Sequence, residues 1–290
     1  MVNTIDKAKT LFEQIEGEER EDKFLLTTHQ IPLHRQEIIG EIKEALAKGK
    51  KITLISTQLI EAGVDLDFDM GYREFAPFGS IIQMAGRVNR EGKKGVCDVF
   101  VFDFLATENQ NEEVKRLPYR AIDLQEDNTI EWLSKPLEEI AILENLESYF
   151  KTIKDETSSI DLLEPMKKLE FFSLFELLNE NFMPNQPWKV SLFIEVRENQ
   201  FNAYIEERDE ILNSPDYDTF EAMNRIKNLE KDLGAYTITV NHKLIEKLAQ
   251  NYPITEKFGR YILIYDNPTY EKYRGFNPEY TAFEEMFDDF

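Results

Sequence analysis

The fold is decided by the stretch ITLISTQLIEAGVDLDFD, residues 52–69, and by QMAGRVNR, residues 83–90. The apolar run Ile52–Ile55 predicts a buried strand, and Ser56 and Thr57 follow at its carboxyl end. Open α/β sheets bind their ligands at that end of their strands. The second stretch carries two arginines three residues apart, which the end of a helix projects to the same side. The sequence therefore predicts a strand, a ligand-facing turn and a helix that ends in paired arginines.

Strands and helices are expected to alternate along the first third of the chain. Helical periodicity covers residues 4–16, 33–48 and 78–88, and short apolar runs cover residues 23–28, 52–56 and 96–104. Alternation of this kind implies a parallel sheet with helices on both faces, so residues 1–105 are predicted to form one α/β domain. Only Met1 and Val2 precede the first helix, so the first strand is expected to be short or missing, with an exposed sheet edge.

The remainder of the chain has a different pattern. Residues 106–160 are acidic and mostly helical in pattern, and we interpret them as a linker. Residues 161–290 are predicted to form a small mixed α+β domain. Its helices are expected over residues 162–181 and 217–233, and its strands over residues 189–194, 235–240 and 260–265.

The chain is strongly acidic, with a net charge of −22 over 290 residues. Residues 1–105 hold 14 Lys and Arg against 18 Asp and Glu, and the rest hold 20 against 38, which divides the charge into −4 and −18. Nucleic-acid binders normally show a basic footprint. Either the acidic residues form a solvated surface that keeps the protein in solution, or they form a face that docks a basic partner or is kept away from DNA.

The composition also bounds the class of protein. Cys97 is the single cysteine, which excludes an internal disulfide and fits a reducing compartment. No apolar run approaches the roughly 18 residues of a membrane helix, and the first ten residues lack the apolar segment of a secretory signal. We therefore expect a soluble, cytoplasmic protein without a membrane partner.

The arginine pair has a specific chemical interpretation. ATP-hydrolysing machines place arginines against the γ-phosphate, where such a finger is worth on the order of 10³–10⁵ in rate. Gly86 lets the backbone come close, and Gln83 and the distance from the earlier stretch favour this interpretation over two surface arginines. Asp65 can accept a hydrogen bond from a ribose or hold the arginines in place. Thr57 can contact a nucleic-acid phosphate, which fixes position without reading sequence, or it can cap an ordinary turn.

Both stretches resemble signature motifs of a known family. STQLIEAGVDLDFD and QMAGRVNR resemble the fifth and sixth motifs of superfamily 2 helicases, and in particular those of the CRISPR-associated nuclease-helicase. Val2-Asn3-Thr4 and LTTHQIPLHR, residues 26–35, resemble the family's fourth motif and the segment before its next helix. Tyr265-Asp266 and YRGF, residues 273–276, resemble the family's C-terminal domain more loosely. The resemblance is strong over residues 1–105 and mainly positional beyond them.

This resemblance implies a RecA-like second motor domain over residues 1–105 and roles for individual residues. Arg87 and Arg90, one of them as the finger, and Gln83 would face the γ-phosphate of ATP. Gly63 and Asp65 would lie beside the nucleotide. The residues implied at the backbone of single-stranded DNA are Thr57, Gln58, Asn3, Thr4 and His29. Movement in the 3′-to-5′ direction and docking on a crRNA-guided surveillance complex are implied as well.

Several parts of such a machine are missing from the sequence. It contains no G-x-x-x-x-G-K-[ST] phosphate loop, no DExD/H box for magnesium, and no histidine cluster with metal-ligand spacing. We therefore expect no metal site, no tight binding of ATP and magnesium to this chain alone, and no hydrolysis by it. The nuclease and first motor domains would come from the same or a separate chain.

Two hypotheses remain open. In the first, the chain is the C-terminal half of an ATP-dependent DNA translocase and is active once the other half is supplied. In the second, it is a non-catalytic interaction or regulatory fragment that docks on the surveillance complex and competes with the full effector. Sequence encoded upstream would discriminate between a fragment and a split enzyme.

Overall fold

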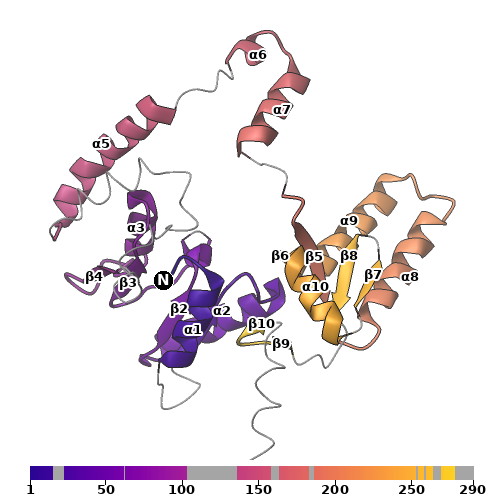
Figure 1. The fold of residues 1–290 in the computed structure, drawn as a ribbon, viewed down its shortest axis with the longest axis horizontal. Coiled ribbons are helices and arrows are strands. Elements are labelled where there is room, and N and C mark those ends of the chain that lie inside the picture. Colours follow the sequence, from indigo (N-terminus) through magenta and orange to yellow (C-terminus); the bar gives the residue numbers. More distant parts are fainter. Residues whose placement is uncertain are drawn as a thin grey trace, which may run out of the picture. The chain divides into compact units, whose positions relative to one another are not determined.

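The computed structural model describes residues 1–15, 23–61, 63–102, 136–157, 163–182, 186–252, 254–257, 259–263 and 269–277 (Figure 1). The chain divides into two compact units. Unit 1 comprises Met1–Thr4 and Ile60–Gln186, and unit 2 comprises Ile5–Leu59 and Pro187–Phe290. Each unit therefore joins segments that are far apart in the sequence. The boundaries predicted at residues 105 and 160 stay predictions.

Unit 1 is built around a pair of parallel strands. Strand β3, Gly71–Glu74, pairs in parallel with β4, Val99–Phe102. Helix α3, Phe78–Ala85, lies between them in sequence, where helical periodicity predicts it. It ends before Gly86, whose N–H donates to the Ile82 carbonyl oxygen at 2.9 Å. The sequence gives no apolar signal for β3, because Arg73 and Glu74 occupy two of its buried positions.

Three further described helices of unit 1 follow a long segment of the chain that lies outside the described residues. They are α5, Glu139–Thr157, α6, Leu163–Lys167, and α7, Phe171–Phe182. Tyr149 of α5 is 3% exposed and meets the ring of Phe78 edge-on, with 5.8 Å between ring centroids. Of the predicted linker, residues 106–135 and 158–160 lie outside the described residues, and the interpretation of residues 106–160 as a linker stays a prediction.

The N-terminal part of unit 2 follows the predicted alternation. Helices α1, Ile5–Gln14, and α2, Pro32–Ala47, accompany the parallel strands β1, Lys23–Leu26, and β2, Thr53–Ser56. Their register pairs Lys23 with Thr53 and Leu26 with Ser56. After α2 the chain turns at Gly49, whose φ of +69° is a conformation that glycine adopts without a side-chain clash.

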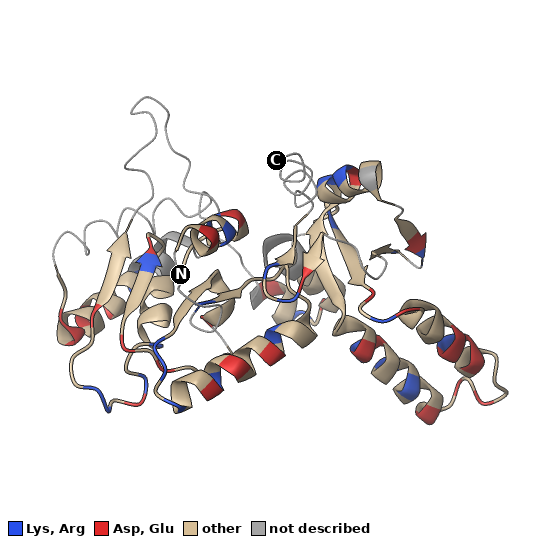
Figure 2. Cartoon of the chain, turned by 90° about the horizontal axis from the view of Figure 1, so that it is seen from below, with Lys and Arg blue, Asp and Glu red and all other residues tan. Residues whose placement is uncertain are grey.

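A four-stranded mixed sheet forms the other part of unit 2. Its order is β6-β5-β8-β7, with bounds Thr237–Asn241, Lys189–Ile194, Arg260–Leu263 and Thr255–Lys257. Three of these strands were expected, although β6 begins later than predicted. Helix α9, Phe220–Gly234, was also expected, whereas α8, Gln200–Leu212, and α10, His242–Asn251, were not. Charged residues are frequent along the helices of the chain, as expected for solvated faces (Figure 2).

Alternate side chains of this sheet enter two different cores. Phe193 and Ile262 pack against helices α8 and α9, whereas Leu192 and Leu263 join a cluster with α10. The second cluster also contains Ile31, which precedes α2, and Phe276 near the end of the chain. One apolar core thus joins the predicted helicase region to the predicted accessory domain.

A short hairpin completes unit 2. Strands β9, Tyr270–Glu271, and β10, Gly275–Phe276, pair antiparallel and lie beside α2 in Figure 1. The Phe276 N–H donates to the His29 carbonyl oxygen at 2.8 Å, and the Phe276 side chain is fully buried. The predicted Tyr265-Asp266 pair lies outside the described residues.

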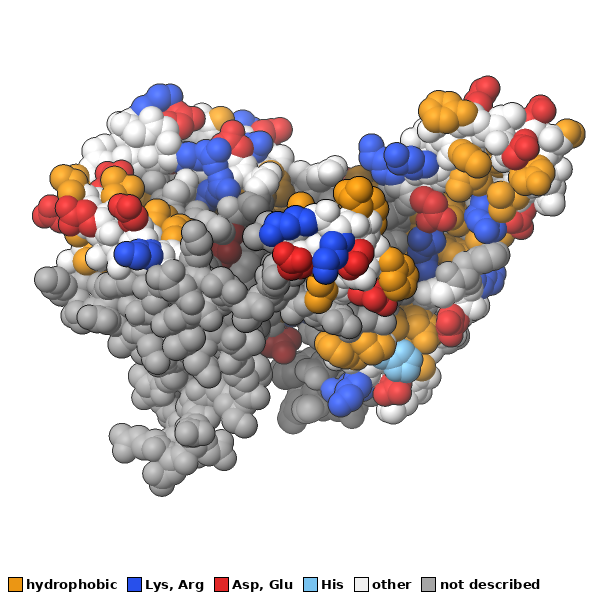
Figure 3. Space-filling view, turned by 90° about the horizontal axis from the view of Figure 1, so that it is seen from above, with side chains coloured by type: hydrophobic (Ala, Val, Ile, Leu, Met, Phe, Trp, Pro, Cys, Tyr) orange, Lys and Arg blue, Asp and Glu red, His pale blue; other side chains and the backbone are white. Residues whose placement is uncertain are grey.

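The coarse fold class is confirmed: the chain is a mixed α/β protein with small sheets and helices. Within the described ranges, no helix combines the length and the apolarity needed to span a bilayer. Large hydrophobic side chains nevertheless reach the surface among charged ones (Figure 3). They are most frequent on α5, on α7 and around the turn between α8 and α9, and include Ile140, Leu143, Phe171, Phe172, Phe175, Phe220 and Met223.

Candidate functional site

Arg87 joins the two signature stretches through backbone groups. It follows the end of α3, and its Nε donates to the Ile60 carbonyl oxygen at 3.0 Å while Nη2 donates to the Glu61 carbonyl oxygen at 2.7 Å. Ile60 is the last residue of the 3₁₀ helix Gln58–Ile60, which follows β2. A guanidinium offers five donors in a rigid fork, so two carbonyls fix its plane and direction.

Arg90 makes a different kind of contact. Its Nε lies 2.9 Å from Asp65 Oδ1, with 40% of the Arg90 side chain and 76% of the Asp65 side chain exposed. The Arg90 backbone N–H also donates to Asp67 Oδ1 at 2.7 Å. Of the two interpretations of Asp65, the structure shows the one in which it holds an arginine. Because the pair is exposed, it orients Arg90 with a modest energy, typically about 0.2–1 kcal/mol.

The remaining residues predicted at the nucleotide lie around these arginines. Gly63 lies within the first stretch and is exposed. Its φ of +76° is a backbone conformation that favours glycine. Gln83 on α3 is exposed. Lys94 contacts Asp67 at 3.2 Å and Asp69 at 3.0 Å, which ties the loop after Arg90 back to the first stretch. The structure therefore brings the two predicted stretches together.

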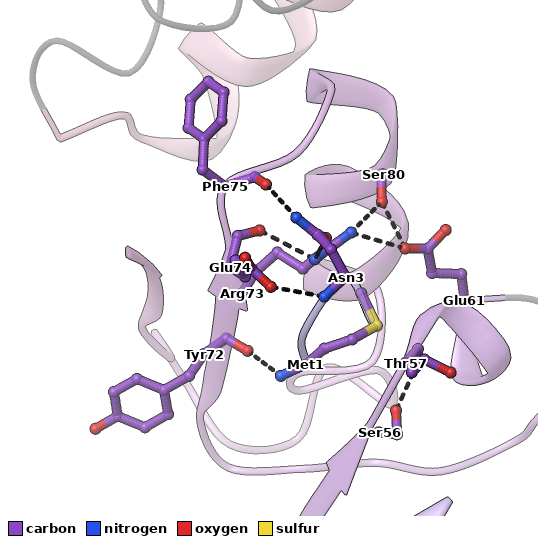
Figure 4. A network of polar contacts seen from close by, with 10 residues as sticks. All are labelled: Met1, Asn3, Ser56, Thr57, Glu61, Tyr72, Arg73, Glu74, Phe75 and Ser80. Carbon is purple, nitrogen blue, oxygen red and sulfur yellow. Dashed lines mark hydrogen bonds and ion pairs between the residues drawn. The ribbon is translucent and has the colours of Figure 1, made fainter. Parts of the chain in front are cut away.

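Unit 1 also contains a buried polar network around Arg73 (Figure 4), which the sequence does not predict. Arg73 is 0% exposed; its Nη1 donates to Asn3 Oδ1 at 2.5 Å and its Nη2 donates to Ser80 Oγ at 2.9 Å. Nη2 also lies 3.4 Å from Glu61 Oε1, which accepts the Ser80 hydroxyl at 2.5 Å. A charged residue at a strand position was the available signal, because a buried arginine needs anionic or carbonyl partners.

The electrostatics of this network centre on Glu61. Burial raises the pKa of the Glu61 carboxyl above its usual range, although the Ser80 hydroxyl and the Arg73 guanidinium act in the opposite direction. The Glu61 carboxylate thus depends on these two partners for its charged form. Its position is therefore coupled to Arg73 and Ser80.

Comparisons with known proteins find relatives of the segment that holds both stretches. Residues 1–93 match the family model for the C-terminal region of the CRISPR-associated nuclease/helicase Cas3. This N-terminal third of the chain is therefore similar to the C-terminal region of Cas3 nuclease-helicases. It is 36% identical over 90 residues to the Cas3 nuclease/helicase of Methanothermobacter thermautotrophicus, and 46% identical over 72 residues to that of Haloferax volcanii. These matches cover 31% and 24% of this chain, but only 11% and 8% of the relatives.

Solved Cas3 structures share the fold over most of the chain. T. fusca Cas3 with AMPPNP has a TM-score of 0.53 at 15% identity, and covers 95% of this chain and 38% of its own. A chain in the structure of a CRISPR RNA-guided surveillance complex before nicking has a TM-score of 0.50 at 16% identity, and the match covers 95% of this chain and 40% of that one. The chain thus spans well under half of these Cas3 chains.

The residues predicted at single-stranded DNA fall in both units. Asn3 and Thr4 belong to unit 1, and Thr57, Gln58 and His29 belong to unit 2. Asn3 is 8% exposed, and its side-chain amide donates to the Phe75 carbonyl oxygen at 2.8 Å. Thr57 is 6% exposed, whereas Gln58 is half-buried. Their assignment to DNA stays a prediction for the Cas3-like region.

His29 has partners within unit 2. Its Nδ1 lies 3.1 Å from the Phe276 carbonyl oxygen, and the two rings meet edge-on at 5.9 Å. Burial, together with the charge of Lys9, lowers the pKa of the His29 imidazole to about 4. The imidazole is therefore uncharged at neutral pH, and its Nδ1 lies between the Phe276 carbonyl oxygen and, at 3.4 Å, Lys9 Nζ. These contacts give His29 a structural role within unit 2, and its assignment to DNA stays a prediction.

Proposed function

We propose that this chain is the second motor half, with its accessory domain, of an ATP-dependent single-stranded DNA translocase of CRISPR interference. In this proposal the parallel strand pairs belong to a RecA-like domain over residues 1–105, and an acidic helical linker leads to the accessory domain. The chain contributes arginines to a nucleotide pocket that it shares with a first motor domain. Its place would be the cytoplasm, where antiviral defence meets foreign DNA.

The observation that carries the proposal is the joining of the two signature stretches. Arg87 is bound by carbonyls of the first stretch at 3.0 and 2.7 Å, and Arg90 is oriented by Asp65 at 2.9 Å. In these contacts neither guanidinium is paired with a buried carboxylate: Arg87 contacts carbonyl oxygens, and the carboxylate beside Arg90 is exposed. Both can therefore accept an anionic partner, which is what stabilisation of a transferring phosphoryl group requires.

The donor chemistry fits a triphosphate only in part. Guanidinium groups suit phosphate oxygens, and the exposed Gln83 of α3 can add a neutral donor. The sequence supplies neither a phosphate loop nor an acidic magnesium box, so this chain would orient and neutralise while the partner domain grips the nucleotide and metal. We expect the purified chain alone to hydrolyse ATP no faster than background.

Reconstitution tests the proposal directly. The purified chain would be mixed with the nuclease and first motor domains of a Cas3 protein, magnesium, ATP and single-stranded DNA. We expect DNA-stimulated ATP hydrolysis that Arg87→Ala or Arg90→Ala lowers on the order of 10³-fold or more. Arg260→Ala, a matched substitution in unit 2 beside Glu230, should leave the rate unchanged. Hydrolysis that is indifferent to Arg87 and Arg90 would remove the basis of the proposal.

Docking on a crRNA-guided surveillance complex is the second candidate function. It is supported by the similarity to a chain in a surveillance-complex structure, and it requires no nucleotide. The chain would occupy the docking surface and compete with the full effector. A competition assay would measure recruitment of a complete Cas3 to the purified surveillance complex as this chain is added. Recruitment that is unaffected at a large molar excess would contradict this candidate.

A further inference from the structure

Glu61 stands at the junction between the buried network and the arginine pair. Its main-chain carbonyl oxygen accepts the Arg87 guanidinium at 2.7 Å, while its carboxylate accepts from Ser80 at 2.5 Å and lies 3.4 Å from Arg73. One residue therefore holds the arginine predicted at the nucleotide on one side and a fully buried arginine on the other. Glu61 belongs to the first signature stretch, and Ser80 belongs to the helix that carries the second.

The network fixes Glu61 from elements that do not belong to either stretch. Arg73 comes from β3, and its Nη1 bonds to Asn3 and to the Glu74 carbonyl oxygen at 3.0 Å. Asn3 is itself fixed, because its backbone N–H donates to Glu74 Oε2 at 2.7 Å. In Figure 4 the Arg73 side chain lies between Asn3, Ser80 and Glu61, with dashed contacts to each. The strand, the first residues of the chain and the helix are thus connected through one guanidinium.

Such a network defines direction in a way that apolar packing does not. A buried guanidinium must keep its hydrogen-bond partners, because leaving them unpaired costs several kcal/mol in a low-dielectric interior. The network therefore restrains residue 61 through its carboxylate, and with it the main-chain carbonyl that Arg87 contacts. The two carbonyls at residues 60 and 61 determine where the Arg87 fork points. A shift of the Glu61 carbonyl would therefore change the direction of the Arg87 guanidinium.

We infer that Arg73 is a positioning residue for Arg87, acting through Glu61 and Ser80. The inference rests on the proposed function in one respect, which is that Arg87 contacts the phosphates of ATP. The geometric part concerns this chain alone. Arg73 is remote from the reacting atoms, so its loss should alter the rate of a catalysed step and leave nucleotide affinity almost unchanged.

The geometric part can be tested on the isolated chain. The Nε–H of Arg87 is hydrogen-bonded to Ile60, so it should exchange slowly with solvent and give a resolved resonance in ¹H–¹⁵N spectra of arginine side chains. Loss of one resonance in Arg87→Lys assigns it. We expect Arg73→Lys and Ser80→Ala to speed this exchange by at least about tenfold. Ser80→Thr, which keeps the hydroxyl, should restore protection.

Two controls separate positioning from general damage. Arg260→Lys makes the same chemical change in an ion pair of unit 2 and should leave the Arg87 resonance unchanged. Ser80→Ala is compatible with a helix, so it keeps the test valid if Arg73→Lys fails to fold. An Arg87 resonance that stays equally protected in folded Ser80→Ala and Arg73→Lys would overturn the inference.

The reconstituted motor supplies the second readout. We expect Ser80→Ala and Arg73→Lys to lower kcat roughly ten- to a hundredfold while KM for ATP changes less than about twofold. Failure of every variant, including the parent chain, to stimulate hydrolysis would contradict the proposed function, and the exchange measurement would still decide the positioning role. Normal kcat in both variants, beside a strong loss in Arg87→Ala, would overturn the positioning role and leave the proposed function standing.

Discussion

The candidate site in unit 1 and the four-stranded sheet in unit 2 are stabilised by opposite means. Around the site, Arg73 is 0% exposed and is surrounded by carbonyl, amide, hydroxyl and carboxylate oxygens. In the sheet, Phe193 is also 0% exposed, but it is surrounded by other hydrophobic side chains. Polar contacts have direction and define where a neighbouring group points, whereas apolar burial is non-directional and scales with area. The chain thus uses directional contacts where orientation is needed and area where stability is needed.

The apolar sheet should give the largest stability effect. Phe193 lies on the central strand β5, where its ring meets that of Phe201 edge-on at 5.1 Å between centroids and lies tilted against that of Tyr236 at 6.1 Å. Phe193→Ala should lower the free energy of unfolding by roughly 4–5 kcal/mol, the upper part of the range for a buried phenylalanine. Urea denaturation measures this. Phe220→Ala, at a side chain 81% exposed, is the matched control and should stay within about 0.5 kcal/mol.

Substitution in the polar network around Arg73 should lower stability in a way that a second substitution can partly reverse. Arg73→Met should lower stability by about 3–4 kcal/mol, because the Glu61 carboxylate, only 14% exposed, loses its cationic partner. Adding Glu61→Gln should recover part of this loss, since the double variant no longer buries an unpaired charge. No second substitution of this kind can refill the cavity left by Phe193. A double variant that unfolds as readily as Arg73→Met alone would remove the contrast between the two regions.

His29 belongs to unit 2, beside Phe276, and should make the stability of this unit depend on pH. Its pKa is lowered from 6.5 to about 4 in the folded protein, so the unfolded chain binds more protons between these values. Stability from the neutral ring is present above about pH 6.5 and is lost as pH falls toward 4, by roughly 3 kcal/mol at most.

Denaturation between pH 4 and pH 8 would test this effect. We expect His29→Gln to flatten the acid limb of the stability curve. His242→Gln, at a histidine whose side chain is 44% exposed, is the control. Curves that run parallel for the parent chain and His29→Gln would show that the imidazole is not desolvated in the way its contacts with Phe276 and Lys9 imply.

The two regions also differ in how far the sequence predicts them. Apolar patterning predicts β1, β2 and β5 from short apolar runs, and α3 from buried hydrophobic residues at helical spacing. It misses β3, whose buried Arg73 and Glu74 look like surface residues until their partners are known. Those partners are more than 60 residues away in the case of Asn3, and no local pattern encodes them.

The predicted site shows the same limit. The pairing of Arg90 with Asp65 was one of two alternatives that the sequence allowed, and the contact of Arg87 with backbone carbonyls could not be read from residue types at all. The prediction of His29 as a DNA contact rested on its local context. That context did not include Phe276, which is 247 residues away. Local motifs therefore suggest which residues form a site, whereas the partners of those residues come from distant parts of the chain.

The hairpin that carries Phe276 gives the smallest and most local test. Gly275 has a φ of +72°, and a Cβ atom there would lie 2.8 Å from both the carbonyl carbon and oxygen of His29. Backbone atoms cannot move aside as a flexible side chain can, so Gly275→Ala should lower stability by about 2 kcal/mol through strain and a lost contact. Unit 1 should keep its own protection, because the clash is confined to unit 2.

Hydrogen exchange measured residue by residue would locate this loss. We expect faster exchange at Phe276 and in the cluster around Ile31, with unchanged protection at the Arg87 side chain. Gly234→Ala is the matched control, since a Cβ there meets nothing within 4 Å and the residue ends a helix; it should be neutral or stabilise by up to about 1 kcal/mol. If Gly275→Ala also released Arg87, orientation at the site would depend on the apolar core of unit 2, and the separation between directional and apolar regions would not hold.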